Sequence, residues 1–410
     1  MPALPPKLKA IVEGGLCTGC GLCAAMTGNT ALRMVLSEEG FLRPEAQGDV
    51  APETDDLIAQ VCPGAVVRID EHDGHFDPDW GPIVELSTGH ARDPEMRFQG
   101  SSGGALSALL QYLMDSGTVK GIAQTVVDPN DPIANTGQLS RTKDDILRAA
   151  GSRYAPSAPL EQLTELLRTP EPLAFVGKPC DVAALRAYAR HRPELAEKFP
   201  VVLSFMCGGI PSRAGALAIL DKMGVDPKEL TDFRYRGQGW PGKARAVTQA
   251  GDTHEMTYAE AWGDFLSSRV QLRCKICPDA TGMTADIVCA DAWFGDERGY
   301  PLFDEAEGRS LIIARTVRGQ AVLEAARTAR FIETEPATLE DVGRMQPYQA
   351  RRRRLVLSRV AVLALLGRFY PRYRGLRLVS AARRTGPLAH LRSFAGMLRR
   401  SLTKRSALSR

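Results

Sequence analysis

The cysteines constrain this chain more than any other feature of its sequence. Nine of its 410 residues are Cys, and Cys17, Cys20 and Cys23 stand at intervals of three positions. The first residues lack the apolar core that is typical of a secretion signal. We therefore expect a reducing, cytoplasmic environment, in which disulfides rarely persist. Clustered cysteines in such a chain are typical of metal ligands or redox thiols.

The spacing C-x2-C-x2-C favours an iron–sulfur cube over a single metal ion, because it presents three thiolates to one cluster. Bacterial ferredoxins continue with a Cys-Pro pair three residues on. Here that position is Thr, and a lone Cys62-Pro63 follows far downstream. A structural zinc site is the alternative, although zinc ligands usually come as C-x2–4-C pairs. We predict a ferredoxin-like module over residues 1–70, with one 4Fe-4S cluster on Cys17, Cys20, Cys23 and Cys62.

Four further cysteines are spread over three segments. Cys180 opens a helical pattern after an apolar strand, Cys207 follows the next apolar strand, and Cys274 and Cys277 form a C-x2-C that ends in Pro. Successive parallel strands end at one edge of an α/β sheet, where ligand sites lie, so these thiols can converge on a second 4Fe-4S cluster. The alternatives are small buried residues for the first two and half a zinc site for the pair. Cys289 lies in an apolar strand, and we expect it in the core.

The rest of the chain alternates between strand and helix patterns. Apolar residues recur at helical spacing over 105–113, and short apolar strands at 173–176 and 201–206 precede further helices. This alternation predicts an α/β fold, a mixed sheet with flanking helices. We expect four parts, namely residues 1–70, 83–170, 171–335 and 336–410.

A glycine–serine turn, Gly100-Ser101-Ser102-Gly103-Gly104, leads into the first of these helices. Free N–H groups and the helix dipole favour a phosphate at such a turn. The alternatives are a plain helix cap and a G-x-S-x-G hydrolase elbow with Ser102 as nucleophile. The elbow needs an apolar strand before it, which is missing here.

The C-terminal segment is strongly basic. Residues 351–410 contain 17 Lys and Arg and no Asp or Glu, whereas the first 350 residues contain 35 basic and 48 acidic residues. The apolar stretch 355–366 is too short and too charged to span a membrane. A basic amphipathic helix suits an anionic membrane surface. One alternative is that the segment packs on the acidic body or on a partner subunit. Another is binding to nucleic acid, which the charge allows but no recognition motif supports.

The motifs form a specific ordered set. They are the cysteine run 17–23, Arg97 to Gly104, Gly177-Lys178-Pro179-Cys180, Cys207 to Ser212, Cys274 to Pro278, and Ala285-Asp286-Ile287. Over residues 10–320 this set resembles the beta-subunit family of deazaflavin-coenzyme hydrogenases and dehydrogenases. The family includes formate dehydrogenase beta subunits and ferredoxin-dependent reductases of chlorophyll pigments.

The resemblance implies a flavoprotein with FAD and one or two 4Fe-4S clusters, whose flavin domain spans the parts 83–170 and 171–335. It implies that the Gly100–Gly104 turn lies at the FAD, and that the second cysteine group holds a cluster beside it. Arg153 and Lys178 match positions expected near the flavin or substrate. From the residues alone, Arg153 and Tyr154 would place a cation and an aromatic ring near a flavin, and a solvated loop is the alternative. The basic segment belongs to no part of the shared pattern.

We therefore expect an iron–sulfur flavoprotein oxidoreductase that passes electrons between two 4Fe-4S clusters and FAD, to or from a small organic substrate. A ferredoxin or another redox protein would be its donor. One alternative is an electron-transfer subunit of a larger complex without its own substrate site. Another is a ferredoxin-dependent reductase of a tetrapyrrole or of a sugar- or lipid-linked intermediate. The expected location is the cytoplasm, peripheral to the inner face of the membrane through the basic segment.

Overall fold

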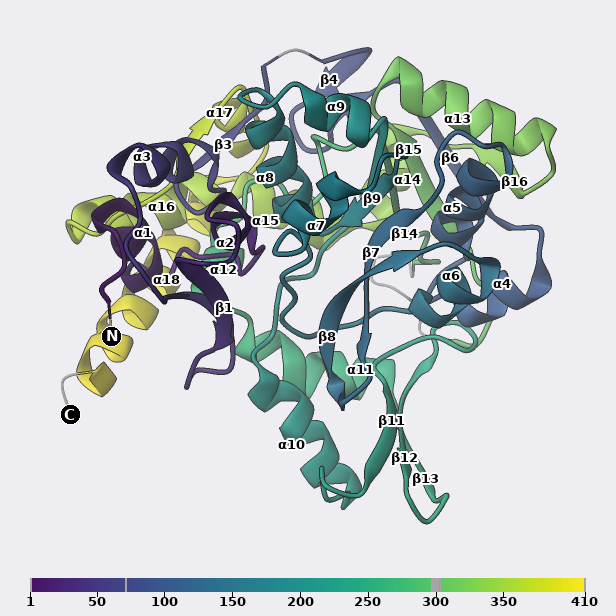
Figure 1. Ribbon diagram of the computed structural model, residues 1–410, viewed down its shortest axis with the longest axis horizontal. Coiled ribbons are helices and arrows are strands. Elements are labelled where there is room, and N and C mark those ends of the chain that lie inside the picture. The colour runs from purple at the N-terminus through teal and green to yellow at the C-terminus, as the bar shows by residue number, and fades with distance from the viewer. Residues whose placement is uncertain (1, 71, 296–301, 303, 409–410) are drawn as a thin grey trace.

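A mixed eight-stranded sheet forms the centre of the fold (Figure 1). The computed structural model describes residues 2–70, 72–295, 302 and 304–408, with side chains as far as 402. Four neighbouring strands run parallel, and the outer ones pair antiparallel. In spatial order the strands are β16 (Ile332–Pro336), β6 (Glu85–Ala91), β15 (Ser310–Ala314), β14 (Ile287–Asp291), β10 (Val201–Phe205), β9 (Ala174–Gly177), β7 (Ile122–Asp128) and β8 (Asp131–Ser140). The predicted mixed α/β class is confirmed.

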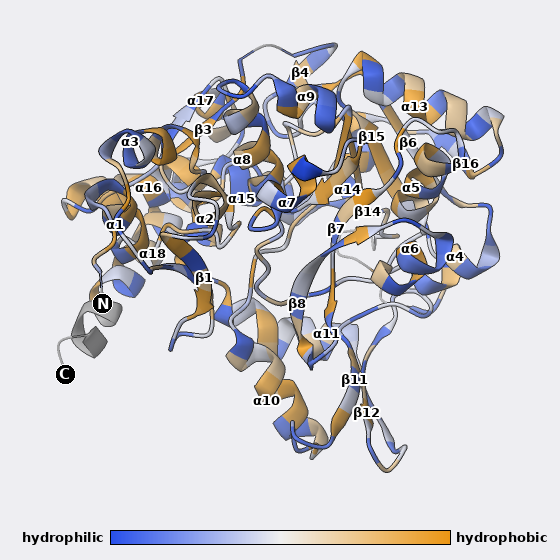
Figure 2. Cartoon of the chain, viewed as in Figure 1, coloured by the Kyte–Doolittle hydropathy of each residue, from blue (hydrophilic) through white to orange (hydrophobic). Residues whose placement is uncertain are grey.

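The central strands are buried on both faces. Every residue of β9 and of β15 is buried, as expected for strands covered by helices on each side. Ile312 packs in the core on one face of the sheet, and its neighbours Leu311 and Ile313 pack in the core on the other. Figure 2 shows apolar residues in β14, whose first four residues, Ile287–Ala290, are apolar. Cys289 of β14 is buried in this core, as its apolar surroundings predicted.

Helices cover the two faces of the sheet. On one face α5 (Ala105–Asp115) packs against α13 (Val317–Thr328) and α6 (Lys143–Ala149), and on the other α8 (Pro179–Ala189) packs against β9 and β10. The shorter helices are α4 (Pro94–Gln99), α7 (Leu163–Arg168) and α9 (Glu194–Lys198). The alternation of strand and helix therefore extends through the middle of the chain, as the apolar pattern predicted.

A separate antiparallel sheet projects from one end of the molecule (Figure 1). It follows α10 (Arg213–Met223) and precedes a short helical stretch, 258–269, and α12 (Leu272–Lys275). Phe233 of its first strand and Tyr235, just after that strand, pack edge to face at 4.7 Å between ring centroids. The three strands are β11 (Leu230–Arg234), β12 (Lys243–Thr248) and β13 (Thr253–Thr257).

The N-terminal part consists of short elements around the first cysteine run. They are α1 (Pro6–Glu13), α2 (Leu22–Met26), the hairpin β1 (Leu32–Leu36) and β2 (Leu42–Ala46), α3 (Pro52–Val61), β3 (Val66–Arg68), and the hairpin β4 (His75–Asp77) and β5 (Gly81–Ile83). Gly21, in the first cysteine run, approaches the body so closely that a Cβ there would lie 2.6 Å from the amide nitrogen of Glu161.

The C-terminal segment returns to this N-terminal part. Strand β17 (Arg372–Arg374) pairs with β3, and Val362, Leu363 and Met397 share a core with Ile11 and Leu16. Figure 1 shows the yellow helices of the C-terminal segment beside the purple N-terminal helices. Among the described residues, no helix is both long and apolar enough to cross a membrane. The helices are α14 (Leu339–Met345), α15 (Pro347–Arg354), α16 (Val356–Leu365), α17 (Leu378–Ala382) and α18 (Pro387–Leu408).

Candidate functional site

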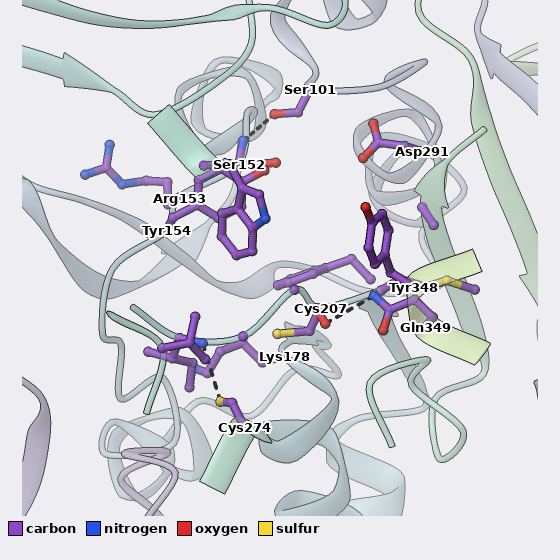
Figure 3. A pocket seen from close by; sticks show the side chains of 18 of the residues that line it. Ser101, Ser152, Arg153, Tyr154, Lys178, Cys207, Cys274, Asp291, Tyr348 and Gln349 are labelled. Carbon is purple, nitrogen blue, oxygen red and sulfur yellow. Dashed lines mark hydrogen bonds between the residues drawn. The ribbon is translucent and has the colours of Figure 1, made fainter. Parts of the chain in front are cut away.

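A cavity of about 1060 Å³ lies where the parallel strands end. Residues that follow β9 and β10 and the last residues of β14 line it, together with residues of the C-terminal helices. This is the sheet edge at which ligand sites of α/β proteins lie. The cavity brings together most of the residues that the motifs singled out, including Lys178, Cys207 and Cys274 (Figure 3).

The glycine–serine turn forms part of the cavity wall and caps α5. Gly104 adopts φ = +67°, and a Cβ there would lie 2.4 Å from the carbonyl oxygen of Met96. Gly100, Ser101, Ser102 and Gly104 line the cavity. Ser101 Oγ accepts the N–H of Ser152. The turn therefore presents backbone groups to the cavity in a conformation that favours glycine.

Gly103 faces away from the cavity, toward the sheet. Its N–H donates to Ser310 Oγ at 3.0 Å, and a Cβ there would lie 2.7 Å from the carbonyl oxygen of Gly89. Ser102 Oγ donates to the carbonyl of Arg309 at 2.7 Å. Ser102 and Gly103 thus anchor the turn on β15 and on the residue before it, and of the five turn residues all but Gly103 line the cavity.

Arg153 lines the cavity with its side chain fully engaged by the protein. Its guanidinium donates to Asn135 Oδ1 at 2.6 Å and to the carbonyls of Pro132, Ala134 and Phe233 at 2.7–3.0 Å. Burial lowers the pKa of this guanidinium. These contacts join β8 to β11, so the side chain braces the wall of the cavity.

Aromatic rings form another part of the wall. Tyr154 packs on Trp262 with ring centroids 4.9 Å apart, and Tyr258 stacks on Trp293 at 5.9 Å with an angle of 14° between planes. We call these four residues the aromatic wall; all four line the cavity. Tyr258 and Trp262 carried no signal in the sequence, since aromatic residues four positions apart are typical of an ordinary helix face.

Lys178 places a fixed ammonium group at the cavity. Its Nζ donates to Ser157 Oγ at 2.7 Å and lies 2.7 Å from Asp181 Oδ2, and both side chains are buried. Although burial opposes the charged form, Asp181 and the neighbouring Cys180 raise the pKa of Lys178. Asp181 therefore keeps the Lys178 ammonium charged beside the second cysteine group, and its own carboxylate largely offsets that charge.

The four cysteines of the first group lie together. Burial, followed by the nearby thiols of Cys17, Cys20 and Cys62, raises the pKa of Cys23 well above its ordinary value. Burial also raises the pKa of Cys20 to about 12. The N–H of Gly19 donates to Cys17 Sγ at 3.4 Å. The donor set is thus four neighbouring thiols with N–H contacts to sulfur, which fits a 4Fe-4S cluster.

The second group also converges from its three loops. Burial raises the pKa of Cys207 to about 12, with Cys274 and Cys277 as neighbouring thiols, and Cys180 has Cys207 and Cys274 as neighbours. Cys274 Sγ accepts the N–H of Ile210 at 3.4 Å. Cys207 and Cys274 line the cavity, on the side of Figure 3 away from Ser101 and Ser152. This donor set also fits a 4Fe-4S cluster.

Among the described residues, no three His, Cys, Asp or Glu side chains stand close enough to hold a single metal ion. A cluster instead takes its thiolates on separate irons. The two cysteine groups adjoin each other, because the buried guanidinium of Arg273 donates to the carbonyl of Pro63 at 2.7 and 3.0 Å. Arg273 directly precedes Cys274, and Pro63 directly follows Cys62.

The C-terminal helices hold the loops of the second cysteine group. Arg352 donates to the carbonyls of Cys207, Gly208 and Cys274 at 2.9–3.0 Å, and Gln349 donates to the carbonyl of Cys207 at 3.2 Å. Figure 3 draws the hydrogen bond from Gln349 to Cys207. Part of this basic segment therefore serves packing on the body, which was one of the alternatives that its sequence left open.

Further side chains of this segment act in the same way. Arg353, Arg359 and Tyr373 each donate to a backbone carbonyl within residues 275–278. Arg354 bonds both carboxylate oxygens of Asp79 at 2.7 and 2.9 Å. These contacts could not be predicted from the sequence, because a carbonyl acceptor leaves no signature there.

Comparison with known proteins identifies the family. Residues 86–164 match the family model of the N-terminal part of the coenzyme F420 hydrogenase/dehydrogenase beta subunit, and residues 171–340 match the model of its C-terminal part. The coenzyme F420 hydrogenase subunit beta of Methanothermobacter thermautotrophicus is 25% identical over 298 residues, which cover 70% of this chain and 97% of that protein. The coenzyme F420-dependent sulfite reductase of Methanocaldococcus jannaschii is 23% identical over 84% of this chain.

The chain spans about half the length of two of its relatives, 51% for this sulfite reductase and 54% for another. A subunit of the F420-reducing [NiFe] hydrogenase complex from Methanosarcina barkeri shares the fold, with a TM-score of 0.56, 20% identity, and coverage of 73% of this chain and 99% of that one. The family models together span more than half of the chain and confirm the resemblance inferred from its motifs. The chain therefore belongs to the coenzyme F420 hydrogenase/dehydrogenase beta subunit family.

Proposed function

We propose that this oxidoreductase is an iron–sulfur flavoprotein that transfers electrons between two 4Fe-4S clusters and an FAD, to or from an organic substrate. One observation carries the proposal: the two groups of four thiols adjoin through Arg273, and the second group opens into the large cavity. Cys17, Cys20, Cys23 and Cys62 would hold the first cluster, and Cys180, Cys207, Cys274 and Cys277 the second.

The flanks of the glycine–serine turn and the aromatic wall would hold the FAD. Bound FAD supplies two-electron exchange with organic molecules and one-electron exchange with clusters. The N–H groups before α5 and the helix dipole favour the diphosphate of a dinucleotide. Tyr154 and Trp262 offer ring faces for stacking, and Arg153 keeps this side of the cavity rigid. Lys178 places a positive charge near the second group, where electron arrival adds negative charge.

The first cysteine group belongs to the small N-terminal module, and the donor would be a reduced ferredoxin or another redox protein.

Relatives named as subunits of hydrogenases and of a formate dehydrogenase favour a second candidate function. In it the chain is an electron-transfer subunit of a larger complex. The roomy cavity favours the first candidate, because a pure relay needs no space for a substrate.

Activity of the isolated chain separates these candidates. The anaerobically purified protein is reduced with reduced methyl viologen, the excess dye is removed, and reoxidation is followed in the visible spectrum. Oxidised coenzyme F420 is the first acceptor to add, because relatives are named for it. Reoxidation by F420 or another organic acceptor supports a substrate site of its own. Reoxidation by protein acceptors alone supports the relay function.

We also propose that α16 and α18 contact an anionic membrane surface. Leu365, Leu388 and Leu391 expose 69%, 58% and 66% of their surface in the segment that carries 17 basic and no acidic residues. Each basic residue near such a surface contributes about 1 kcal/mol. Sedimentation with phosphatidylglycerol vesicles, but not with phosphatidylcholine vesicles, is expected. Replacing Leu388 and Leu391 by Glu should abolish it, and equal sedimentation of both proteins would contradict the proposal.

A further inference from the structure

One wall of the cavity carries only positive charge on its ionisable side chains. Lys275, which lies between Cys274 and Cys277, and five arginines of α15, α16 and α18 contribute to this wall. Among the described residues, Asp291 is the one carboxylate that lines the cavity, and both its oxygens bond to Arg236 at 2.7 and 2.9 Å. We call the following residues the cationic wall: Lys275, Arg351, Arg352, Arg359, Arg392 and Arg400.

These cations disfavour one another. Burial, followed by the charges of Arg352, Arg400 and Arg351, lowers the pKa of Arg359 to about 10. The segment 351–410 has no Asp or Glu that could compensate them. Within the described part of the chain, the guanidinium groups of Arg351 and Arg392 make no hydrogen bond or ion pair. Like charges gathered in a partly closed space are costly, and an anion between them removes that cost.

Packing of the protein accounts for only some of these charges. Arg352 donates to three carbonyls, and Arg359 donates to the carbonyl of Lys275 at 2.7 Å and to Ser393 Oγ at 3.0 Å. Arg351 and Arg392 face the cavity without such a role. Guanidinium groups match phosphate and carboxylate oxygens in paired hydrogen bonds. The wall is therefore suited to a group with two or more negative charges.

The cavity is slightly larger than pockets that usually hold one ligand. Its volume of about 1060 Å³ exceeds the roughly 300–1,000 Å³ that is typical of pockets for one ligand. The glycine–serine turn and the cationic wall lie on different elements, the turn anchored on β15 and the wall on the C-terminal helices. The five arginines of the cationic wall lie beyond residue 340, where the match to the family model ends, and only Lys275 lies within that match.

We propose that the cationic wall binds a multiply charged anionic group of the organic substrate, a diphosphate or a pair of carboxylates. That the ligand is a substrate rests on the proposed function, in which the reacting part of the molecule would lie toward the aromatic wall and the FAD. The anionic group positions the substrate, and no bond to that group forms or breaks.

Inorganic pyrophosphate is the probe, and its binding to the purified holoprotein is measured by isothermal titration calorimetry. The variant is the double substitution Arg351→Gln with Arg392→Gln. The matched control is Arg374→Gln with Arg383→Gln, which removes the same charge from two exposed residues of the same segment outside the cavity. We expect the variant to bind at least tenfold more weakly than the wild type, and the control to bind within twofold of it.

Equal weakening in both double variants would overturn the proposal, because it would mean a diffuse attraction to a basic surface. Absence of pyrophosphate binding by the wild type would overturn it as well. Loss of FAD from the variant but not from the control would assign the wall to the cofactor's diphosphate and overturn the substrate assignment. A protein that binds pyrophosphate through this wall but contains neither flavin nor iron would refute the proposed function and leave the anion site standing.

Discussion

Arg352 is the residue at which the C-terminal helices and the second cysteine group depend on each other most directly. Its guanidinium donates to the carbonyls of Cys207, Gly208 and Cys274 at 2.9, 3.0 and 3.0 Å. Arg352 therefore ties together two of the three loops that supply the second group. Replacing it by Leu keeps the apolar stem and removes all three hydrogen bonds.

The expected effect follows from these contacts. A hydrogen bond to a charged group contributes about 1.5–3 kcal/mol when buried, and the partial exposure of Arg352 reduces this to about 1 kcal/mol for each bond. Three bonds then stabilise the closed arrangement of the loops by about 3 kcal/mol. Since every 1.4 kcal/mol is tenfold, Arg352→Leu should raise the population of the open loops by roughly a hundredfold.

Iron release to a chelator under anaerobic conditions measures this opening. Two clusters predict two phases, and Arg352→Leu should accelerate only the phase that belongs to the second group. Arg352→Lys keeps the charge but loses the paired donors, so its rate of iron release in that phase should lie between those of the wild type and Arg352→Leu. Arg383→Leu, on the exposed surface of the same segment, should leave both phases unchanged. Unchanged release from Arg352→Leu, or equal acceleration of both phases with a lower unfolding temperature, would refute the reasoning.

Three further substitutions test other parts of the account. Cys62→Ser should lower the iron content by about half, as measured by iron and sulfide analysis, and leave flavin bound. Asp79→Asn should lower the unfolding temperature at pH 7, and the difference should shrink as the pH falls below about 4. Although burial favours the neutral form, two arginines lower the pKa of Asp79, so its stabilisation is present above about pH 4 and lost on acidification. Gly104→Ala should reduce the flavin content, because left-handed backbone costs about 1–2 kcal/mol and the new Cβ meets a carbonyl 2.4 Å away. Gly117→Ala, at φ = +74°, has the same backbone strain, but its new Cβ would meet only Lys120 Nζ, at 3.6 Å, so it should keep its flavin.

The sequence was most informative where chemistry depends on local spacing. The C-x2-C-x2-C run and the C-x2-C pair each place thiols on one short turn, and the apolar runs 173–176 and 201–206 are buried strands of the sheet. The order of parallel strands then brings their carboxyl ends to one edge, so the position of Cys207 beside the cavity follows from topology. The sequence could therefore predict the class of fold and the side of the sheet on which the cavity lies.

Long-range contacts were beyond such reasoning. A basic amphipathic segment has the same pattern whether it lies on a membrane or on the protein, so the sequence could not reveal that Arg352 and Arg353 bond to cysteine-loop carbonyls. The turn at 100–104 was predicted as one unit, yet Gly103 faces β15 while its neighbours face the cavity. Which face of a turn meets a ligand depends on the strand behind it. The cationic wall likewise exists only because α15, α16 and α18 pack beside the distant loop that contains Lys275.

We propose that the eight cysteines hold two clusters next to a flavin. Anaerobic purification followed by quantification of iron, sulfide, zinc and flavin is the decisive test. We expect about eight iron and eight sulfide per chain, as two 4Fe-4S clusters require, with one FAD. About one zinc per chain in a colourless, flavin-free protein would contradict the account, because the cysteines would then be structural and the cavity would belong to other chemistry.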